Sequence, residues 1–355
     1  MPVHLVYLVD TSGSMQSADK IGLAKKSLHL LTQSRKKGDT VALCTYAGSV
    51  REVLAPTGID SKGRIEAAID DLTAGGSTAM ASGIELAYNL AERTLVKGHV
   101  NRVVVLSDGD ANVGATSHEE ILKTIRSAKA KGITLSTVGF GNGNYKDTMM
   151  EQLANQGDGN YSYIDSESQA RRVFSEQISA LLQVIARDVK IQVEFDPKVV
   201  REYRLIGYEN RDVADKDFRN DRVDAGEIGA GHSVTAIYDV VLTSTLTSPV
   251  TVRVRHKEPL GGEKASESVF RMDPSAITRT FDAAPADVRF AAAAASFAEI
   301  LRRSPHAKEW HLSDVQRVAR AAAVDRGDQQ EFLEIVKRAN ALSGGAALPG
   351  TNVAR

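Results

Sequence analysis

The sequence has few of the residues that would cross-link the chain, charge it strongly or hold it in a membrane. Its single cysteine, Cys44, lies in the apolar run TVALCTYA, so neither an internal disulfide nor a thiolate metal site can form. The formal net charge of -1 leaves no overall basic field to hold a nucleic-acid backbone. No run of about 18 apolar residues occurs. We therefore expect no nucleic-acid partner and no membrane-spanning segment.

The 355 residues are enough for about two domains, and the first part of the chain alternates between two patterns. Short runs rich in β-branched residues alternate with longer stretches whose apolar residues recur at helical spacing. Such alternation predicts right-handed crossovers and a mostly parallel sheet with helices on both faces. The short link at Gly48 and Ser49 predicts one antiparallel edge strand. We predict a doubly wound α/β domain over residues 1–186, with strands at residues 4–9, 40–47, 50–55, 102–107, 133–141 and 161–164.

The pattern changes after an amphipathic segment at residues 166–186, which we predict to be one long helix that ends at about Ala186. Five segments that alternate apolar and polar residues follow, with turn-forming residues between them. They predict an antiparallel β-sandwich over residues 187–283. Helical spacing returns over residues 284–343, and the composition of residues 344–355 is typical of a disordered tail.

Oxygen-bearing side chains follow the ends of the predicted parallel strands. Asp10, Ser12 and Ser14 come directly after the first strand, in the motif DTSGS, and Asp108 follows the strand RVVVL. Thr78 lies in the segment AGGSTAMASG, which leads into a helix. Because ligands of open parallel sheets bind beyond the carboxyl ends of the strands, we expect these five side chains to converge.

Two carboxylates and three hydroxyls form a donor set for a hard divalent cation. Mg²⁺ prefers six oxygen ligands at about 2.0–2.1 Å and tends to keep some waters. We therefore expect a metal site made by Asp10, Ser12, Ser14, Thr78 and Asp108, with Mg²⁺ bound and with Mn²⁺ or Ca²⁺ as alternatives. Since hydroxyls are neutral, the ion keeps much of its charge and can attract a carboxylate from outside.

The motifs DTSGS, GGSTAM and SDGDANVG together resemble the metal-ion-dependent adhesion site of von Willebrand factor type A (VWA) domains. The family pattern is D-x-S-x-S, a distant Thr and a distant Asp, and the five residues above match it without substitution. The resemblance covers about the first 186 residues. It implies a Rossmann-like VWA fold and metal-dependent binding of a protein that presents an Asp or Glu carboxylate, in adhesion or complex scaffolding.

A narrower resemblance covers nearly the whole chain. GGSTAMASGIELAY, GFGNGNYKDTMMEQLANQGDGNYSYID and RLIGYENRDVADKDF are similar to a bacterial family of VWA proteins with a C-terminal region of unknown function. Such chains are often labelled calcium-activated chloride channel homologues, but with no spanning segment we do not expect a channel. Members tend to have a segment ahead of the VWA domain. We expect this chain to be cut from a longer, periplasmic or membrane-anchored precursor, and to be cytoplasmic otherwise.

Two other interpretations use the same acidic residues. Asp108, Asp110, Asn112 and Glu119 have the spacing of an EF-hand loop, but Val113 stands where that loop needs glycine. Mg²⁺-dependent phosphoryl transfer with Asp10 as nucleophile is the alternative function, since haloacid-dehalogenase-like phosphatases place such an Asp at a strand end. Their D-x-D motif has a second Asp as acid and base, and the hydroxyl of Ser12 cannot replace it near neutral pH. We therefore expect a binding protein and not an enzyme.

Overall fold

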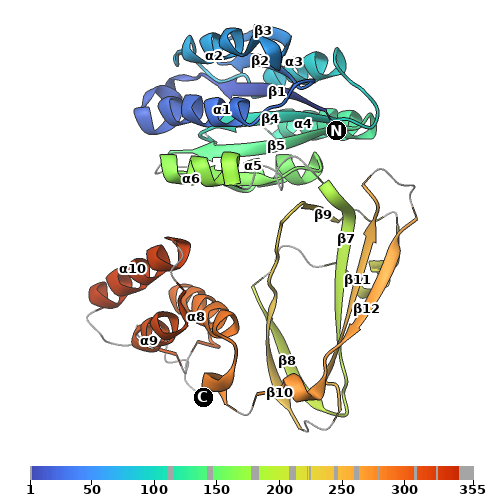
Figure 1. The fold of residues 1–355 in the computed structure, drawn as a ribbon, viewed down its shortest axis with the longest axis vertical. Helices are drawn as coiled ribbons and strands as arrows, with labels where there is room; N and C mark the ends of the chain where they lie inside the picture. Colours follow the sequence, from blue (N-terminus) through green and yellow to red (C-terminus); the bar gives the residue numbers. More distant parts are fainter. Residues whose placement is uncertain are drawn as a thin grey trace. The chain divides into compact units, whose positions relative to one another are not determined.

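The N-terminal part of the chain is built on a six-stranded sheet, as the alternating pattern predicts (Figure 1). Its strands are β1 (Val3–Asp10), β2 (Thr40–Tyr46), β3 (Val50–Gly58), β4 (Val100–Ser107), β5 (Ile133–Phe140) and β6 (Tyr161–Ile164). The strand order is β3-β2-β1-β4-β5-β6, and β1 is parallel to both of its neighbours. Strands β2 and β3 are antiparallel, which confirms the edge hairpin predicted at Gly48 and Ser49.

Helices cover both faces of this sheet. One face packs against α1 (Leu23–Gln33), α2 (Lys62–Asp70) and α6 (Glu167–Arg171), and the other against α3 (Met80–Glu92), α4 (Ala115–Ala130) and α5 (Asp147–Gln156). Strand β1 is buried along its whole length, with Tyr7 in the first core and Leu8 in the second. Because successive side chains of a strand point to opposite faces, a strand that is apolar throughout needs cover on both. The doubly wound α/β prediction is confirmed.

The structure is a computed structural model that describes residues 2–109, 115–141, 147–176, 184–207, 213–221, 223, 225–243, 247–259, 264–278, 280–307, 310–324 and 327–343. It divides into two compact units. The first comprises residues 1–190, 220–232 and 255–266, and the second residues 191–219, 233–254 and 267–355. The domain boundaries predicted at residues 186, 283 and 343 stay predictions, and residues 344–355 lie outside the described part.

An all-β region follows the first sheet, as predicted. Its strands are β7 (Val184–Phe195), β8 (Val200–Ile206), β9 (Gly226–Gly229), β10 (Ile237–Leu242), β11 (Val250–Lys257) and β12 (Ser266–Arg271). They form a four-stranded sheet of order β12-β11-β7-β9 and a two-stranded sheet of β10 and β8. The pairs β7–β9 and β8–β10 are antiparallel. The ring of Phe195 in β7 stacks on that of Tyr203 in β8, with ring centroids 4.4 Å apart, so aromatic packing joins the two sheets.

The long helix predicted over residues 166–186 is wrong at its C-terminal end. The segment forms α6 and then a π-helical turn, η4 (Arg172–Glu176), whereas β7 begins at Val184. Residues 177–183 lie outside the described part. Val184 and Ala186 pair with Gly229 and Ile228 of β9. Apolar residues at 184–186 fit either a helix or a strand, and cross-strand pairing decides between them.

Helices α8 (Ala286–Leu301), α9 (Leu312–Ala322) and α10 (Gly327–Leu342) confirm the helical spacing of the C-terminal part. They share a core in which Phe297 of α8 contacts Phe332 of α10 edge to face, with ring centroids 5.5 Å apart. Val315 of α9 and Val336 of α10 are fully buried in the same core. Short helical turns in the described part of the chain also include η1 (Gly13–Gln16), η2 (Ala18–Gly22), η3 (Ile59–Ser61), η5 (Asp215–Asp217), η6 (Pro274–Ala276) and η7 (Phe281–Ala283).

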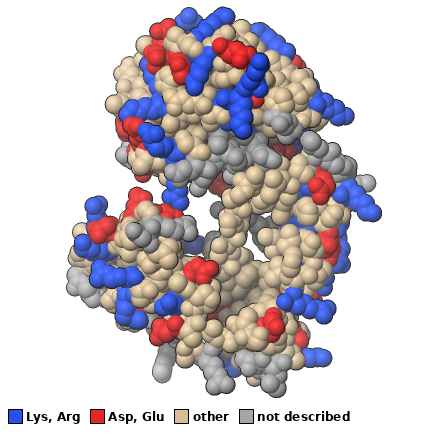
Figure 2. Space-filling model, viewed as in Figure 1, with Lys and Arg blue, Asp and Glu red and all other residues tan. Residues whose placement is uncertain are grey.

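Charged side chains of both signs are mixed on the surface (Figure 2), in agreement with the net charge of -1. On the face in view in Figure 2, Lys and Arg side chains are interspersed with Asp and Glu side chains. Among the described residues, no helix combines the length and the apolar character that crossing a membrane requires.

Candidate metal centre

The carboxyl ends of β1 and β4 lie side by side at the point where the strand order reverses. From β1 the chain proceeds outward to β2 and β3, and from β4 it proceeds in the other direction to β5 and β6. In open α/β sheets this switch point is the usual place for a ligand. Val9 is paired with Leu106, so the residues that follow them, Asp10 and Ser107, meet at this edge. Asp108 comes next, and the predicted convergence of the two strand ends is therefore present.

Asp10 is held by hydrogen bonds to both of its carboxylate oxygens. It is fully buried; its Oδ1 accepts a hydrogen bond from the Ser12 backbone N–H at 2.9 Å, and its Oδ2 accepts one from Ser107 Oγ at 2.8 Å. Ser107 Oγ in turn accepts a hydrogen bond from the Gly109 N–H at 3.0 Å. Burial raises the pKa of Asp10 and the negative charge of Asp108 adds to the rise, while the hydrogen bonds from Ser12 and Ser107 oppose it. A cation at this position would stabilise the buried carboxylate.

The DTSGS loop is fastened to the segment that carries Thr78. The Gly13 N–H donates to Gly76 O at 2.9 Å, and the Gly75 N–H donates to Thr11 O at 2.7 Å. These contacts bring the two backbones close together. Thr78 lies two residues after Gly76 and two residues before Met80, the first residue of α3, and it is partly buried.

The hydroxyls of the first motif face one another. Ser12 Oγ and Ser14 Oγ lie 3.1 Å apart and share a hydrogen bond. Ser12 is buried, whereas Ser14 is partly exposed. The structure thus brings Asp10, Ser12 and Ser14 into one hydrogen-bonded group.

Lys20 reaches into the same group, and sequence reasoning missed it. Its Nζ donates to Asp108 Oδ2 at 2.9 Å and to Ser14 O at 3.0 Å. The Asp108 side chain is 2% exposed and that of Lys20 is 23% exposed. Lys20 lies in the π-helical turn η2, which precedes the start of α1 at Leu23. Ser107 was also missed as a partner of Asp10, although it adjoins Asp108 in the motif.

The side chains at this edge fit a hard divalent cation by their chemistry. Among the described residues, no three His, Cys, Asp or Glu side chains come together as a metal cluster. The group is instead made of oxygen donors, two carboxylates with hydroxyls beside them. Oxygen donors of this kind suit Mg²⁺, Mn²⁺ or Ca²⁺ and do not suit soft metals.

The EF-hand interpretation depends on residues that are partly outside the described part of the chain, since residues 110–114 are not described. Glu119, which would supply the last ligand of such a loop, lies in α4. Its carboxylate is paired with Arg126 Nη2 at 3.7 Å, and its side chain is 75% exposed. Glu119 therefore takes part in a surface ion pair on its own helix.

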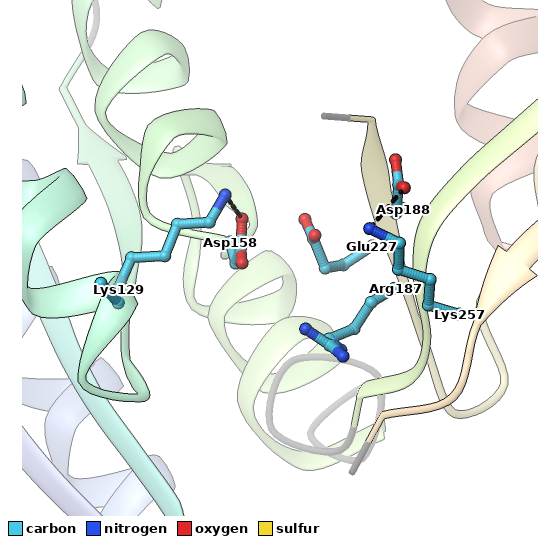
Figure 3. A pocket seen from close by; sticks show the side chains of 7 residues that line it. Lys129, Asp158, Arg187, Asp188, Glu227 and Lys257 are labelled. Carbon is cyan, nitrogen blue, oxygen red and sulfur yellow. Dashed lines mark ion pairs between the residues drawn. The ribbon is translucent and has the colours of Figure 1, made fainter. Parts of the chain in front are cut away.

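A cavity of about 280 Å³ lies at the opposite edge of the first sheet (Figure 3). It is lined near the end of α4 by Lys129 and before β6 by Asp158, and these two side chains form an ion pair. Lys257 Nζ of β11 is paired with Asp188 Oδ2 of β7 at 3.1 Å, on the other side of the cavity (Figure 3). Arg187 and Glu227 add one charge of each sign to the lining. The positive and negative side chains that line the cavity balance one another. We therefore interpret these ion pairs as structural and not as a ligand site.

Comparisons with known proteins agree with this architecture. Residues 4–177 match the family model of the von Willebrand factor type A domain. Residues 180–249 and 245–342 match the model of the C-terminal region of the uncharacterized protein YfbK. A solved von Willebrand factor type A protein from Catenulispora acidiphila superimposes with a TM-score of 0.55 over 94% of this chain and 82% of that one, at 16% identity. That likeness shows the fold.

Two bacterial relatives resemble most of the chain. The uncharacterized protein YfbK of Escherichia coli (strain K12) is 37% identical over 363 residues, which cover 96% of this chain and 62% of the relative. The uncharacterized protein sll0103 of Synechocystis is 21% identical over 271 residues, which cover 74% of this chain and 63% of the relative. The chain therefore spans about three fifths of the length of these relatives.

Proposed function

The chain carries a von Willebrand factor type A domain followed by a YfbK-type C-terminal region, and from this premise we propose that it is a metal-dependent protein-binding module. Domains of this type generally mediate metal-dependent interaction between proteins. The observation that supports the proposal most directly is the hydrogen-bonded oxygen group at the switch point, centred on the buried Asp10.

In this proposal Asp10, Ser12, Ser14, Thr78 and Asp108 would hold one divalent cation, Mg²⁺ in the first instance. The neutral hydroxyl ligands would not cancel the positive charge of the ion. The ion could therefore bind an Asp or Glu carboxylate of a partner protein. Ser107 and the Ser12 N–H hold the Asp10 carboxylate in one orientation. The role would be adhesion or the scaffolding of a complex, with loops around the site selecting the partner.

The alternative, phosphoryl transfer with Asp10 as nucleophile, has less support. Both oxygens of Asp10 accept hydrogen bonds, and position 12 offers a hydroxyl whose neighbour is the hydroxyl of Ser14. A hydroxyl with an ordinary pKa cannot act as general acid and base near neutral pH. The arrangement therefore favours binding over catalysis.

The test is calorimetric titration of metal-depleted protein with Mg²⁺, Mn²⁺ and Ca²⁺, for the wild type and for the double variant Asp10→Ala, Ser12→Ala. We expect about one ion per chain for the wild type and no binding for the double variant, since a divalent cation needs several oxygen ligands together. With Mn²⁺ bound, added acetate serves as a minimal carboxylate. It should lower the water-proton relaxation enhancement by displacing a metal-bound water.

Two outcomes would contradict the proposal. The first is a wild type that binds none of the three ions, or binds them as well as the double variant does. The second is steady, Mg²⁺-dependent release of phosphate from an aryl phosphate that disappears in Asp10→Ala, which would favour the enzyme.

A further inference from the structure

The ammonium group of Lys20 occupies a defined place within the oxygen group. It contacts one carboxylate oxygen of Asp108 and the backbone oxygen of Ser14, at 2.9 and 3.0 Å. Since the Asp108 side chain is 2% exposed, Lys20 is bound to a carboxylate that has little contact with solvent. Lys20 is thus a cation already bound to a residue that a metal ion would need.

The aliphatic part of the Lys20 side chain, its stem, packs against the backbone of Gly141. Gly141, directly after β5, has a φ of +92°, and a Cβ at this position would lie 2.5 Å from Lys20 Cε. Only a residue without a side chain allows the stem to run so close to this backbone. The position of Gly141 is fixed in turn, because its carbonyl oxygen accepts a hydrogen bond from Tyr163 Oη at 2.6 Å. The contact between Lys20 and Asp108 therefore depends on the packing of the stem as well as on charge.

We propose that Lys20 is an internal cation that competes with the divalent metal for Asp108 and so sets the metal affinity of the site. The inference rests on the function proposed above. An ammonium group and a divalent ion on the same carboxylate would be close enough to repel each other strongly. A metal ion held by Asp108 would therefore require Lys20 to leave that carboxylate. The partial exposure of the Lys20 side chain leaves it a way to solvent.

If the contact between Lys20 and Asp108 had an orienting role, its loss would change the metal affinity in the opposite direction. If Lys20 served only to orient Asp108 for the metal, its loss would weaken metal binding, as the loss of other groups that hold ligands in place does. The sign of the change in affinity therefore separates competition from orientation.

The experiment is calorimetric titration of the full chain with Mn²⁺ for the wild type, Lys20→Met and Lys20→Arg. Lys20→Met keeps most of the stem and removes the charge, and we expect it to bind Mn²⁺ at least about tenfold more tightly, which corresponds to about 1.4 kcal/mol. Lys20→Arg keeps the charge and should stay near the wild type. The matched control is Lys25→Met, because Lys25 donates to the Asp70 carbonyl oxygen on the exposed surface, away from the site. It changes the net charge equally and should leave the affinity unchanged.

An independent readout is the rise in melting temperature on addition of Mn²⁺, which should be larger in Lys20→Met than in the wild type, since tighter binding to the folded state gives more stabilisation. If Lys20→Met does not fold, Lys20→Gln takes its place.

Equal or weaker Mn²⁺ binding by the charge-removing variant, beside a wild type that binds, would overturn the inference and leave the metal-dependent function standing. Binding by neither protein would overturn both. Tighter binding by Lys20→Met than by a wild type that binds, abolished by Asp10→Ala in the same background, would support the inference.

Discussion

Ser107 offers a direct test of how the structure holds Asp10. Its hydroxyl donates to Asp10 Oδ2 at 2.8 Å and accepts from the Gly109 N–H at 3.0 Å, and the residue is fully buried. Ser107→Ala removes one hydroxyl and leaves the backbone in place. Two buried groups, a carboxylate oxygen and an N–H, then lose a partner, while none of the expected metal ligands is changed.

The expected loss follows from these two hydrogen bonds. A hydrogen bond to a charged group contributes about 1.5–3 kcal/mol, and a buried N–H left without a partner costs about 1–3 kcal/mol. Protonation of Asp10 can offset part of the first amount, because burial already raises its pKa. We expect Ser107→Ala to lower the free energy of unfolding of the metal-free first unit by about 2–4 kcal/mol. The loss of an orienting group should also weaken metal binding by about tenfold or more.

The assay must report on the first unit alone. The single tryptophan, Trp310, lies in the second unit, so its fluorescence does not follow the sheet that carries the site. The single cysteine, Cys44, lies fully buried in β2 of that sheet. Labelling of its thiol at increasing urea concentration, with a chelator present, therefore measures the unfolding of this sheet.

Ser27→Ala is the matched control. Ser27 is fully buried in α1, and its Oγ has no hydrogen-bond partner among the described residues. Removal of a buried hydroxyl that has no partner should be neutral or slightly stabilising. If Ser107→Ala and Ser27→Ala unfold at the same urea concentration, the hydrogen bonds of Ser107 do not support Asp10, and our account of how the site is held together is wrong.

Two further predictions concern the same sheet. Gly159→Ala should destabilise the first unit by about 3 kcal/mol, since its Cβ would lie 1.9 Å from Leu135 O. Gly63→Ala in α2 is the control, because its Cβ would meet nothing within 4 Å and should not destabilise the unit. Urea unfolding of both variants compares their free energies of unfolding. Burial raises the pKa of Cys44 to about 12, so its thiol should resist labelling at about pH 8 until the sheet unfolds; rapid labelling of native protein would contradict this burial.

The architecture of the six-stranded sheet was predictable because its sequence signals are local. Every residue of β1 is buried, and the apolar run of the sequence shows this directly. The link at Gly48 and Ser49 is too short for a crossover, so it predicts the antiparallel pair of β2 and β3. The strand ends then place Asp10 and Asp108 at one edge, since the switch point follows from the strand order.

The features that could not be predicted depend on contacts between distant segments. The start of β7 is decided by pairing of Val184 and Ala186 with β9, about 40 residues further along the chain. The position of Lys20 depends on the turn η2 and on the lack of a side chain at Gly141, which lies at the end of another strand. Periodicity describes each segment by itself, and so it contains no signal for such a contact.

The charges of the site connect the two proposals. With both carboxyl groups ionised, Asp10 and Asp108 would carry two negative charges, and one divalent ion would cancel both. A partner's carboxylate would bring the site to a net negative charge, and the ammonium group of Lys20, released from Asp108 but tethered beside it, would cancel that charge. Because an uncompensated charge in a partly buried site is costly, the two proposals together predict that the most stable state would contain the metal, the partner's carboxylate and Lys20. On this reasoning the metal and the partner's carboxylate should each increase the affinity of the site for the other by the same factor.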